Sequence, residues 1–140
     1  MPSRRAPVTK RQYEALANFR YRMRQFLRYS EEITRKHGMT PLQYQLLLQV
    51  KGYPAREWAT ISELAERLQA KHHGVVSLIT RCEKLGLVKR RPSDEDRRIV
   101  HVHLKPRGEA AVGRLAELHR DELLAHRDQF VVSRELGGKR

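Results

Sequence analysis

The sequence contains a single cysteine, Cys82, among its 140 residues. One cysteine cannot form an internal disulfide, so a reducing compartment fits better than a disulfide-stabilised secreted scaffold. Long hydrophobic runs are also missing: no segment approaches the roughly 20 apolar residues of a membrane span, and the N-terminal MPSRRAPVTK lacks the hydrophobic stretch of a secretion signal. We therefore expect a cytoplasmic protein without a membrane partner.

Aromatic residues are also scarce, at 6%. The chain has 29 Lys and Arg against 16 Asp and Glu, giving a net charge of +13 and a pI near 10.6. This balance indicates a polyanionic partner, most commonly nucleic acid. An acidic membrane surface is the alternative, but no predicted helix sets a large apolar face opposite an unbroken basic one.

A single, mainly helical domain is expected over residues 1–140, with a basic lead-in at residues 1–10 and a frayed tail at 137–140. Its first helix spans residues 12–38 and ends at Gly38, which suits a left-handed C-terminal position. Residues of one face recur at steps of three and four: Leu16, Phe19, Met23, Phe26, Leu27, Ser30 and Ile33. A helix this long needs a surface to lie against, either in the same chain or in a partner subunit.

Two capping boxes predict the starts of two further helices. Thr40 and Gln43 flank Pro41 at the first helical position, and Thr60 and Glu63 open a shorter helix. The residues expected to face inward are Leu42, Leu46, Leu47 and Val50 in the first of these helices, and Ile61, Leu64, Ala65 and Leu68 in the second.

The next predicted helix runs from about His72 to Leu85 and is closed by Gly86. Its inward face carries Val75, Ile79, Cys82 and Leu85. Its outward face is polar and basic and includes His72, His73, Val76, Ser77, Thr80, Arg81 and Lys84.

From Leu87 the hydrophobic period changes to two, which predicts a two-stranded hairpin. Val88 begins one strand; in the other, Val100, Val102 and Leu104 face inward and His101 and His103 outward. The residues between them, 90–98, form a charged loop. A C-terminal helix follows, marked by Ala111, Leu115, Leu118, Leu123 and Leu124.

A capped helix, a basic helix and a charged hairpin in direct succession are the order of a winged helix-turn-helix. This motif places one helix in a DNA major groove and the hairpin, or wing, beside it. The sequence therefore predicts a mainly α fold with a small β-wing and double-stranded DNA as the partner.

Three segments resemble the MarR family of bacterial transcriptional regulators: residues 64–68 (LAERL), 83–88 (EKLGLV), and the Asp-Arg-Arg triplet at 96–98 ahead of Leu104 and Gly108. The resemblance implies a homodimer in which helices 12–38 and 107–136 intertwine, and a winged-helix lobe at 40–105. It also implies binding to a pseudo-palindromic operator, with affinity often tuned by a small molecule or oxidant.

The chain departs from the family pattern at residues 104–108, where the usual Leu-Thr reads Leu104-Lys105. Loss of that Thr removes a helix cap, for which Pro106 partly substitutes as a first-turn residue. Few residues follow, so a short last helix or one merged with its predecessor is expected.

The N-terminal half of helix 72–85 should face DNA, because free backbone N–H groups and the positive dipole end suit phosphates. Lys71, His72 and Ser77 are candidates for phosphate or base contacts. His73, beside the small Gly74, is the best candidate for a base edge, and Arg81 could reach a guanine or a phosphate. The alternative for all of these residues is that they form a solvated helix face without a binding role.

In the wing, the resemblance implies that Asp96 and Arg98 form an acidic–basic pair. Asp96 would brace the Arg98 guanidinium by a forked contact, and Arg98 would enter the minor groove. Arg90, Arg91 and Arg97 would hold phosphates. The alternative is a surface charge cluster that only keeps the protein soluble.

Other site chemistries have weaker support. His72-His73 and His101-x-His103 could suggest metal, but no carboxylate or thiol lies beside them at ligand spacing, so no metal or cofactor is expected. Cys82 falls on an inward face and is interpreted as a buried structural thiol rather than a redox sensor.

The functional alternatives are a nonspecific nucleic-acid-compacting protein and, with least support, an enzyme, because the chain has no Gly-rich phosphate loop, HExxH or G-x-S-x-G motif. The resemblance makes Tyr21, Arg24, Tyr44 and Trp58 conceivable effector-pocket residues. The effector, the operator and the sign of control are left open.

Overall fold

A computed structural model of the protein describes residues 6–130 and 132–137. The expected basic lead-in and frayed tail therefore lie partly outside the described residues. In chain order the elements are α1 (Lys10–Lys36), α2 (Pro41–Lys51), β1 (Trp58–Thr60), α3 (Ile61–Leu68), α4 (His72–Lys84), β2 (Val88–Pro92), β3 (Val100–Leu104), α5 (Pro106–Ala125) and the 3₁₀ turns η1 (Arg127–Phe130) and η2 (Arg134–Leu136). The fold is mainly α with a small β-wing, as predicted.

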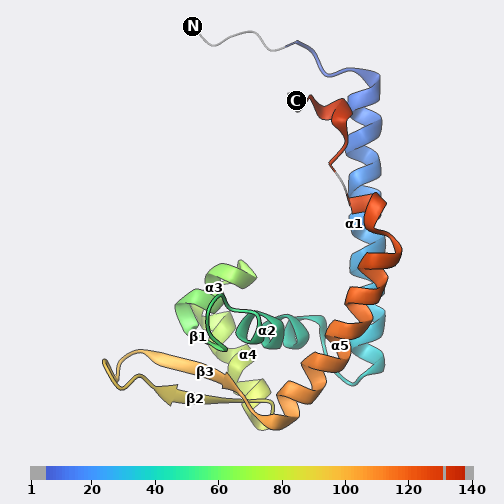
Figure 1. Cartoon of the computed structure of the whole chain (residues 1–140). Coiled ribbons are helices and arrows are strands. Elements are labelled where there is room, and N and C mark those ends of the chain that lie inside the picture. Colours follow the sequence, from blue (N-terminus) through green and yellow to red (C-terminus); the bar gives the residue numbers. More distant parts are fainter. Residues whose placement is uncertain (1–5, 131, 138–140) are drawn as a thin grey trace, which may run out of the picture.

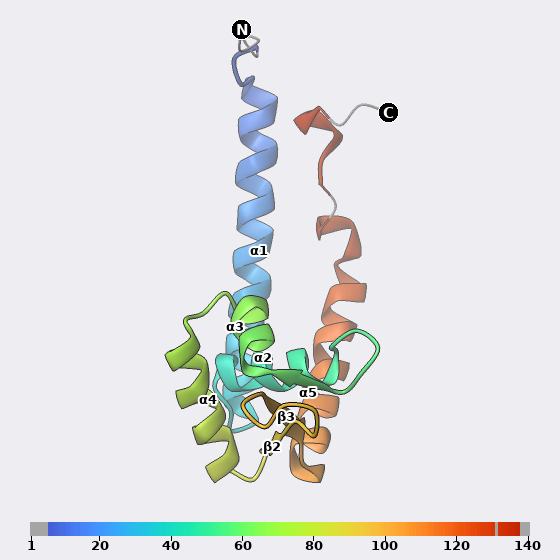
Figure 2. The ribbon, with the colours of Figure 1, turned by 90° about the vertical axis from the view of Figure 1, so that its left-hand side faces the viewer.

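The elements form two parts, shown in Figures 1 and 2. The lobe contains α2, α3, α4 and the sheet. The stalk contains α1, the C-terminal part of α5, η1 and η2, and it projects away from the lobe, with both 3₁₀ turns in contact with α1. No helix of the described residues is both long enough and apolar enough to cross a membrane.

Local capping signals set the helix starts. Thr40 with Gln43 and Thr60 with Glu63 both form the predicted reciprocal boxes. The first helix begins at Lys10, two residues before its predicted start, because Thr9 and Gln12 form a third box that the sequence reading missed. Gly38 follows the helix with φ +74°, in the left-handed conformation that was predicted.

The sheet has three strands in the order β1-β3-β2, and both pairings are antiparallel. The sequence predicted only the β2–β3 hairpin and missed the third strand of the sheet. Strand β1 pairs with the edge of β3 opposite β2, which places Ala59 opposite Val102. A three-residue strand is too short to show a period in the sequence. The predicted loop 90–98 was also too long, since Arg90, Arg91 and Pro92 belong to β2.

The core lies inside the lobe, where α2, α3 and α4 pack on one face of the sheet with the start of α5. Fully buried side chains include Leu46, Leu47, Val50, Leu64, Val75, Ile79, Cys82, Val102 and Leu115. Burying a side chain of this size stabilises the fold by about 1.5–3 kcal/mol relative to leaving it exposed. This core holds α4 and the wing together as one unit.

Two residues predicted to face inward are exposed instead. Leu42, at 53% exposure, lies in the first turn of α2, beyond the part of that helix that the core covers. Leu85, at 43%, is the C-cap of α4, where the chain is already leaving the helix. Leu78 is buried in α4 although it was not predicted to be.

The junction of stalk and lobe is built around His119 of α5, which is 6% exposed. Its Nε2 lies 2.7 Å from the Ser30 hydroxyl of α1, and its Nδ1 lies 2.7 Å from the Leu115 carbonyl. Its ring stacks on Tyr44 of α2 with centroids 4.6 Å apart. One side chain thus joins three helices.

Helix α5 starts without a side-chain cap at Lys105 and with Pro106 in its first turn, as the departure at residues 104–108 predicted. The expected helix 107–136 is continuous only to Ala125; η1 and η2 follow in place of further α-helix. Large apolar side chains remain exposed on the stalk at Leu16, Met23, Leu27, Leu123 and Leu124.

Candidate nucleic-acid interface

The N-terminal half of α4 forms an exposed polar surface. All six positions predicted for DNA contacts in this region are exposed: Lys71, His72, His73, Gly74, Ser77 and Arg81. Lys71 caps the helix through its backbone alone, without a side-chain hydrogen bond. The first N–H groups of α4 are therefore not satisfied by a capping side chain and can meet an anion.

Gly74 has a specific place on this surface. A Cβ built at this position would meet no atom within 4 Å. Neither packing nor a positive φ therefore requires glycine at this point of the fold. The position leaves open space beside His73, where another molecule could approach the helix backbone closely.

The tip of the wing is a compact, internally bonded loop. The Ser93 N–H donates to the Ile99 carbonyl at 2.8 Å, and the Ile99 N–H donates to the Asp96 carbonyl at 2.9 Å. The Ser93 side chain, 7% exposed, accepts from the Glu95 N–H at 3.3 Å. These bonds hold the loop in a defined shape.

Within this loop the predicted forked contact between Asp96 and Arg98 is present. The Arg98 Nε and Nη2 donate to the two carboxylate oxygens of Asp96, each at 3.1 Å, and the Arg98 backbone N–H donates at 3.0 Å. Hydrogen bonds from the Arg98 side chain and backbone lower the pKa of Asp96. The Arg98 side chain is nevertheless 91% exposed, so its guanidinium is oriented yet accessible.

The remaining wing arginines differ in their surroundings. Arg97 is exposed in the loop, and Arg91 is exposed on the face of β2 that points away from α4. Arg90 instead reaches back to α4, where it forms an ion pair with Glu83 and hydrogen bonds with Thr80 and the Val76 carbonyl. The structure therefore separates Arg90 from the other residues predicted to hold phosphates.

The outward face of the sheet carries an aromatic stack that the sequence reading missed. His101 stacks on Trp58 at 3.7 Å between ring centroids, and the Arg56 guanidinium lies over the indole at 3.9 Å. Burial, then the positive charges of His101, Lys89 and Arg91, lower the pKa of His103. Among the described residues, no three His, Cys, Asp or Glu side chains gather as a metal site would require.

Cys82 is a buried structural thiol, as predicted. Its side chain is fully buried, and burial raises its pKa to about 11. A thiol of this kind is largely protonated at neutral pH and is a poor nucleophile.

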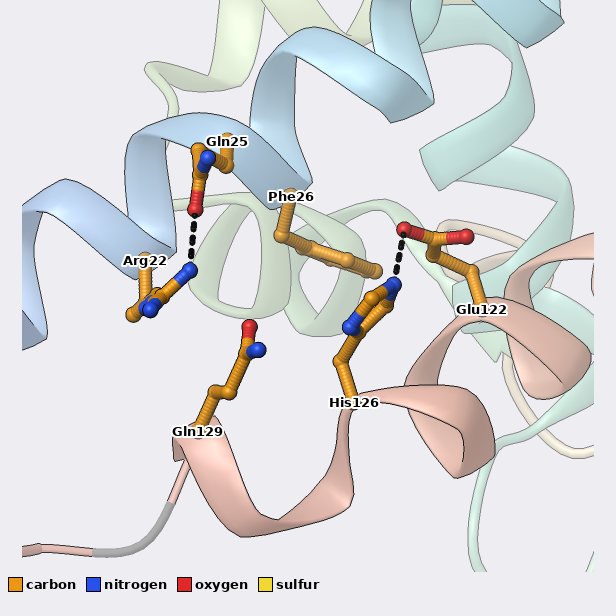
Figure 3. A pocket seen from close by; sticks show the side chains of 6 residues that line it. All are labelled: Arg22, Gln25, Phe26, Glu122, His126 and Gln129. Carbon is orange, nitrogen blue, oxygen red and sulfur yellow. Dashed lines mark hydrogen bonds and ion pairs between the residues drawn. The ribbon is translucent and has the colours of Figure 1, made fainter.

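The conceivable effector-pocket residues do not line one cavity. Tyr44 is buried in the core against His119, Trp58 belongs to the stack on the sheet, and Tyr21 is exposed on α1. A separate cavity of about 130 Å³ lies between α1 and the end of α5, shown in Figure 3. It is lined by Arg22, Gln25, Phe26, Glu122, His126 and Gln129.

Comparison with known proteins relates this architecture to a family of regulators. The sequence model of the MarR family matches residues 37–99. The HTH-type transcriptional repressor MdtR of Bacillus subtilis is 31% identical over 78 residues, which are 56% of this chain and 48% of the relative. The chain thus spans about half the length of the curated relatives that it matches.

Solved structures extend the likeness to the whole fold. AbsC, a MarR family transcriptional regulator from Streptomyces coelicolor, superimposes with a TM-score of 0.75 at 20% identity, covering 94% of this chain and 88% of AbsC. A mutant of MarR from E. coli, crystallised with operator DNA, gives 0.64 at 23% identity, covering 76% and 72% of the two chains. Residues 37–99 thus match the MarR family model, and the chain has the fold of MarR family regulators.

Proposed function

We propose that this protein is a sequence-specific, DNA-binding transcriptional regulator that acts as a homodimer on a pseudo-palindromic operator. The observation that carries the proposal is the exposed Arg98 guanidinium, braced by Asp96 on the same lobe as the exposed start of α4. The operator complex of the E. coli relative supports the same partner. No enzymatic step is part of the proposal.

DNA binding and dimerisation are assigned to different parts of the chain. The winged-helix lobe at residues 40–105 binds DNA, and helices within 12–38 and 107–136 dimerise. The exposed apolar side chains of the stalk support the second assignment, because Leu27 and Leu124 are 56% and 60% exposed in the single chain. A second copy would cover them.

Each surface residue has a proposed role in the complex. His73 reads a base edge in the major groove, while Lys71, His72 and Ser77 contact phosphate or base at the same helix end. Arg81, one turn further along, contacts a guanine or a phosphate. Arg98 enters the minor groove, and Arg91 and Arg97 hold the flanking phosphates.

A small-molecule effector would occupy the cavity of Figure 3, between α1 and α5. The Arg22 Nε is buried there without a hydrogen-bond partner, and Gln25 accepts from the Arg22 Nη1 at 3.0 Å. A donor that lacks an acceptor favours an anionic group, and the Phe26 ring favours a flat apolar one. The effector must bind one conformation of the dimer better than another to change operator affinity.

The test is selection of bound duplexes from a random DNA pool, followed by affinity measurements on the selected sequence. A two-fold-related consensus is expected. Arg98→Ala should weaken binding broadly and change the preference at A/T-rich flanks, whereas His73→Ala should relax one base position by about 1–3 kcal/mol of discrimination. Arg114→Ala, at an exposed arginine of α5, is the control.

Two results would overturn the proposal. Recovery of no consensus would indicate a protein that binds nucleic acid without regard to sequence. Equal effects of Arg98→Ala and Arg114→Ala would show that Arg98 contributes only net charge.

A further inference from the structure

We infer that Arg90 is a positioning residue that clamps the wing to the recognition helix α4, and that it does not contact DNA phosphate. This inference rests on the proposed function, because its consequence is measured as operator recognition. It changes the role that the sequence alone predicts for Arg90.

The clamp has three attachment points on α4. The Arg90 Nη2 donates to the Val76 carbonyl at 3.3 Å and to the Thr80 hydroxyl, and the Nε pairs with the Glu83 carboxylate at 2.5 Å. Positions 76, 80 and 83 are separated by four and three residues, so they lie along one face of the helix. The guanidinium of one strand residue therefore contacts groups from two successive turns of α4.

Alternation along β2 separates Arg90 from its neighbours. Lys89 pairs with His103 and Arg91 with His101, and both basic side chains are exposed on the face opposite α4. Only every second side chain of a strand points to the same face, so Arg90 turns toward the helix while Lys89 and Arg91 do not. Arg90 therefore contacts α4, whereas its basic neighbours Lys89 and Arg91 remain exposed to solvent.

Charge and burial agree with this assignment. The Arg90 and Glu83 side chains are 33% and 36% exposed, and each neutralises the other. Arg98 is also paired, but it stays 91% exposed at the tip of the wing. A guanidinium already neutralised by an ion pair within the protein releases few counterions when DNA binds.

The clamp matters because α4 and the wing must meet successive grooves at a fixed separation. The connection between them is short: Leu85, Gly86 with φ +73°, and Leu87. The buried Val88 and Val102 fix the base of the hairpin. Without the contacts of Arg90, the outer part of the hairpin is held to α4 less tightly and can sample orientations that do not fit both grooves. Recognition then weakens although no DNA contact is removed.

The test compares Arg90→Gln with Arg91→Gln, a matched arginine on the opposite face of the same strand. Affinity for the selected operator is measured at several salt concentrations. Arg90→Gln should weaken operator binding by roughly fivefold to thirtyfold, the effect of 1–2 kcal/mol, and leave the salt slope unchanged. Arg91→Gln should reduce the slope by about one.

Glu83→Gln and Thr80→Val, which alter the helix side of the clamp, should reproduce the loss of affinity caused by Arg90→Gln. The exchanged pair Arg90→Glu with Glu83→Arg should recover part of it. A salt slope that falls by about one in Arg90→Gln, with Glu83→Gln behaving as wild type, would overturn the inference and make Arg90 a phosphate contact.

Amide hydrogen exchange of the DNA-free protein separates this inference from the proposed function. Arg90→Gln should accelerate exchange in β2 and β3 while the α1 amides stay unchanged. Faster exchange without any operator preference in the wild type would contradict the proposed function and leave the clamp standing. Unchanged exchange in the hairpin would contradict the clamp itself.

Discussion

Glu63 shows how one side chain can serve both local and tertiary structure. Its carboxylate accepts from the Thr60 N–H at 2.9 Å as part of the capping box and pairs with Arg56, whose guanidinium lies over Trp58. Burial alone would raise the pKa of Glu63, but hydrogen bonds from Tyr53, Thr60 and Arg56 hold it at about 2. The charged form is therefore strongly favoured in the folded state.

Glu63→Gln should destabilise the protein at pH 7 by on the order of 1 kcal/mol, because the carboxylate is partly screened by solvent and Gln keeps the acceptor of the capping box. Since the folded-state pKa lies below the usual 4.5, the carboxylate's stabilisation is present above about pH 4.5 and is lost as the pH falls toward 2. The variant and the wild type should thus converge in acid. Urea unfolding at pH 7 and at pH 3 measures the difference.

The control is Glu66→Gln, at an exposed position of the same helix, which should change the free energy of unfolding little at either pH. A Glu63→Gln variant as stable as wild type at pH 7 would contradict the role given to this carboxylate.

Gly108 is required by a close approach of α5 to the end of the α4–β2 connection. A Cβ at this position would lie 2.1 Å from the Leu87 carbonyl oxygen, and that oxygen also accepts from the Lys105 N–H at 2.9 Å. Gly108→Ala should therefore force the backbones apart and destabilise the fold by about 1–3 kcal/mol.

The control is Gly113→Ala, in the same helix, where an added Cβ would meet no atom within 4 Å. This substitution should instead stabilise the fold by roughly 0.5–1 kcal/mol. Thermal unfolding of the two variants should shift in opposite directions; equal shifts would contradict this explanation.

At the scale of elements, the features that the sequence predicted are those encoded within a few neighbouring residues. The capping residues Thr40 and Thr60, the stop at Gly38 and the forked pair of Asp96 with Arg98 each span four residues or fewer. Each of these features depends on residues close together in the chain, so it can be predicted from the sequence.

Features that depend on distant partners were missed. Strand β1 exists because Trp58 and its neighbours pair with β3, some forty residues later in the chain. Arg90 looked like one more wing arginine because its partners on α4 are brought close only by the folded hairpin. Leu85 fitted the helical period, but the period continues past the residue at which α4 ends.

His103, on the outward face of the sheet, should make the free energy of unfolding depend on pH. The folded-state pKa of His103 lies below its usual 6.5, so the unfolded chain binds this proton more readily. Stability should therefore fall as the pH drops from about 7 through the window below 6.5, and His103→Gln should reduce this loss. Thermal unfolding at pH 7.5 and 5.5 measures it, with His72→Gln as the control at an exposed histidine of α4. An equal acid-dependent loss in His103→Gln and wild type would contradict the prediction.

At the scale of the whole molecule, the stalk should mediate self-association. Leu27→Glu places a charge where an apolar side chain is 56% exposed in the single chain. If a second copy covers this position, where burial of one leucine contributes about 1.5–3 kcal/mol, the dimer should dissociate at least tenfold more readily. Sedimentation equilibrium measures the constant, and Lys36→Glu, exposed on the same helix, is the control. A wild-type monomer, or an unchanged constant in Leu27→Glu, would contradict this assignment.

The net charge of +13 predicts strong nonspecific attraction to DNA, so affinity alone does not distinguish a regulator from a general DNA-binding protein. We expect the base contacts of α4 and the wing to add a preference for sequence that does not depend on total charge. These two contributions respond differently to salt.

The most direct measurement is therefore the affinity for the selected operator and for a shuffled duplex of equal length, from 50 to 200 mM salt. Neutralising about 6–10 phosphates should weaken both affinities by roughly 10³–10⁵ across this range, while the operator remains the tighter ligand at 200 mM. Equal affinities for the two duplexes at 200 mM would contradict the account.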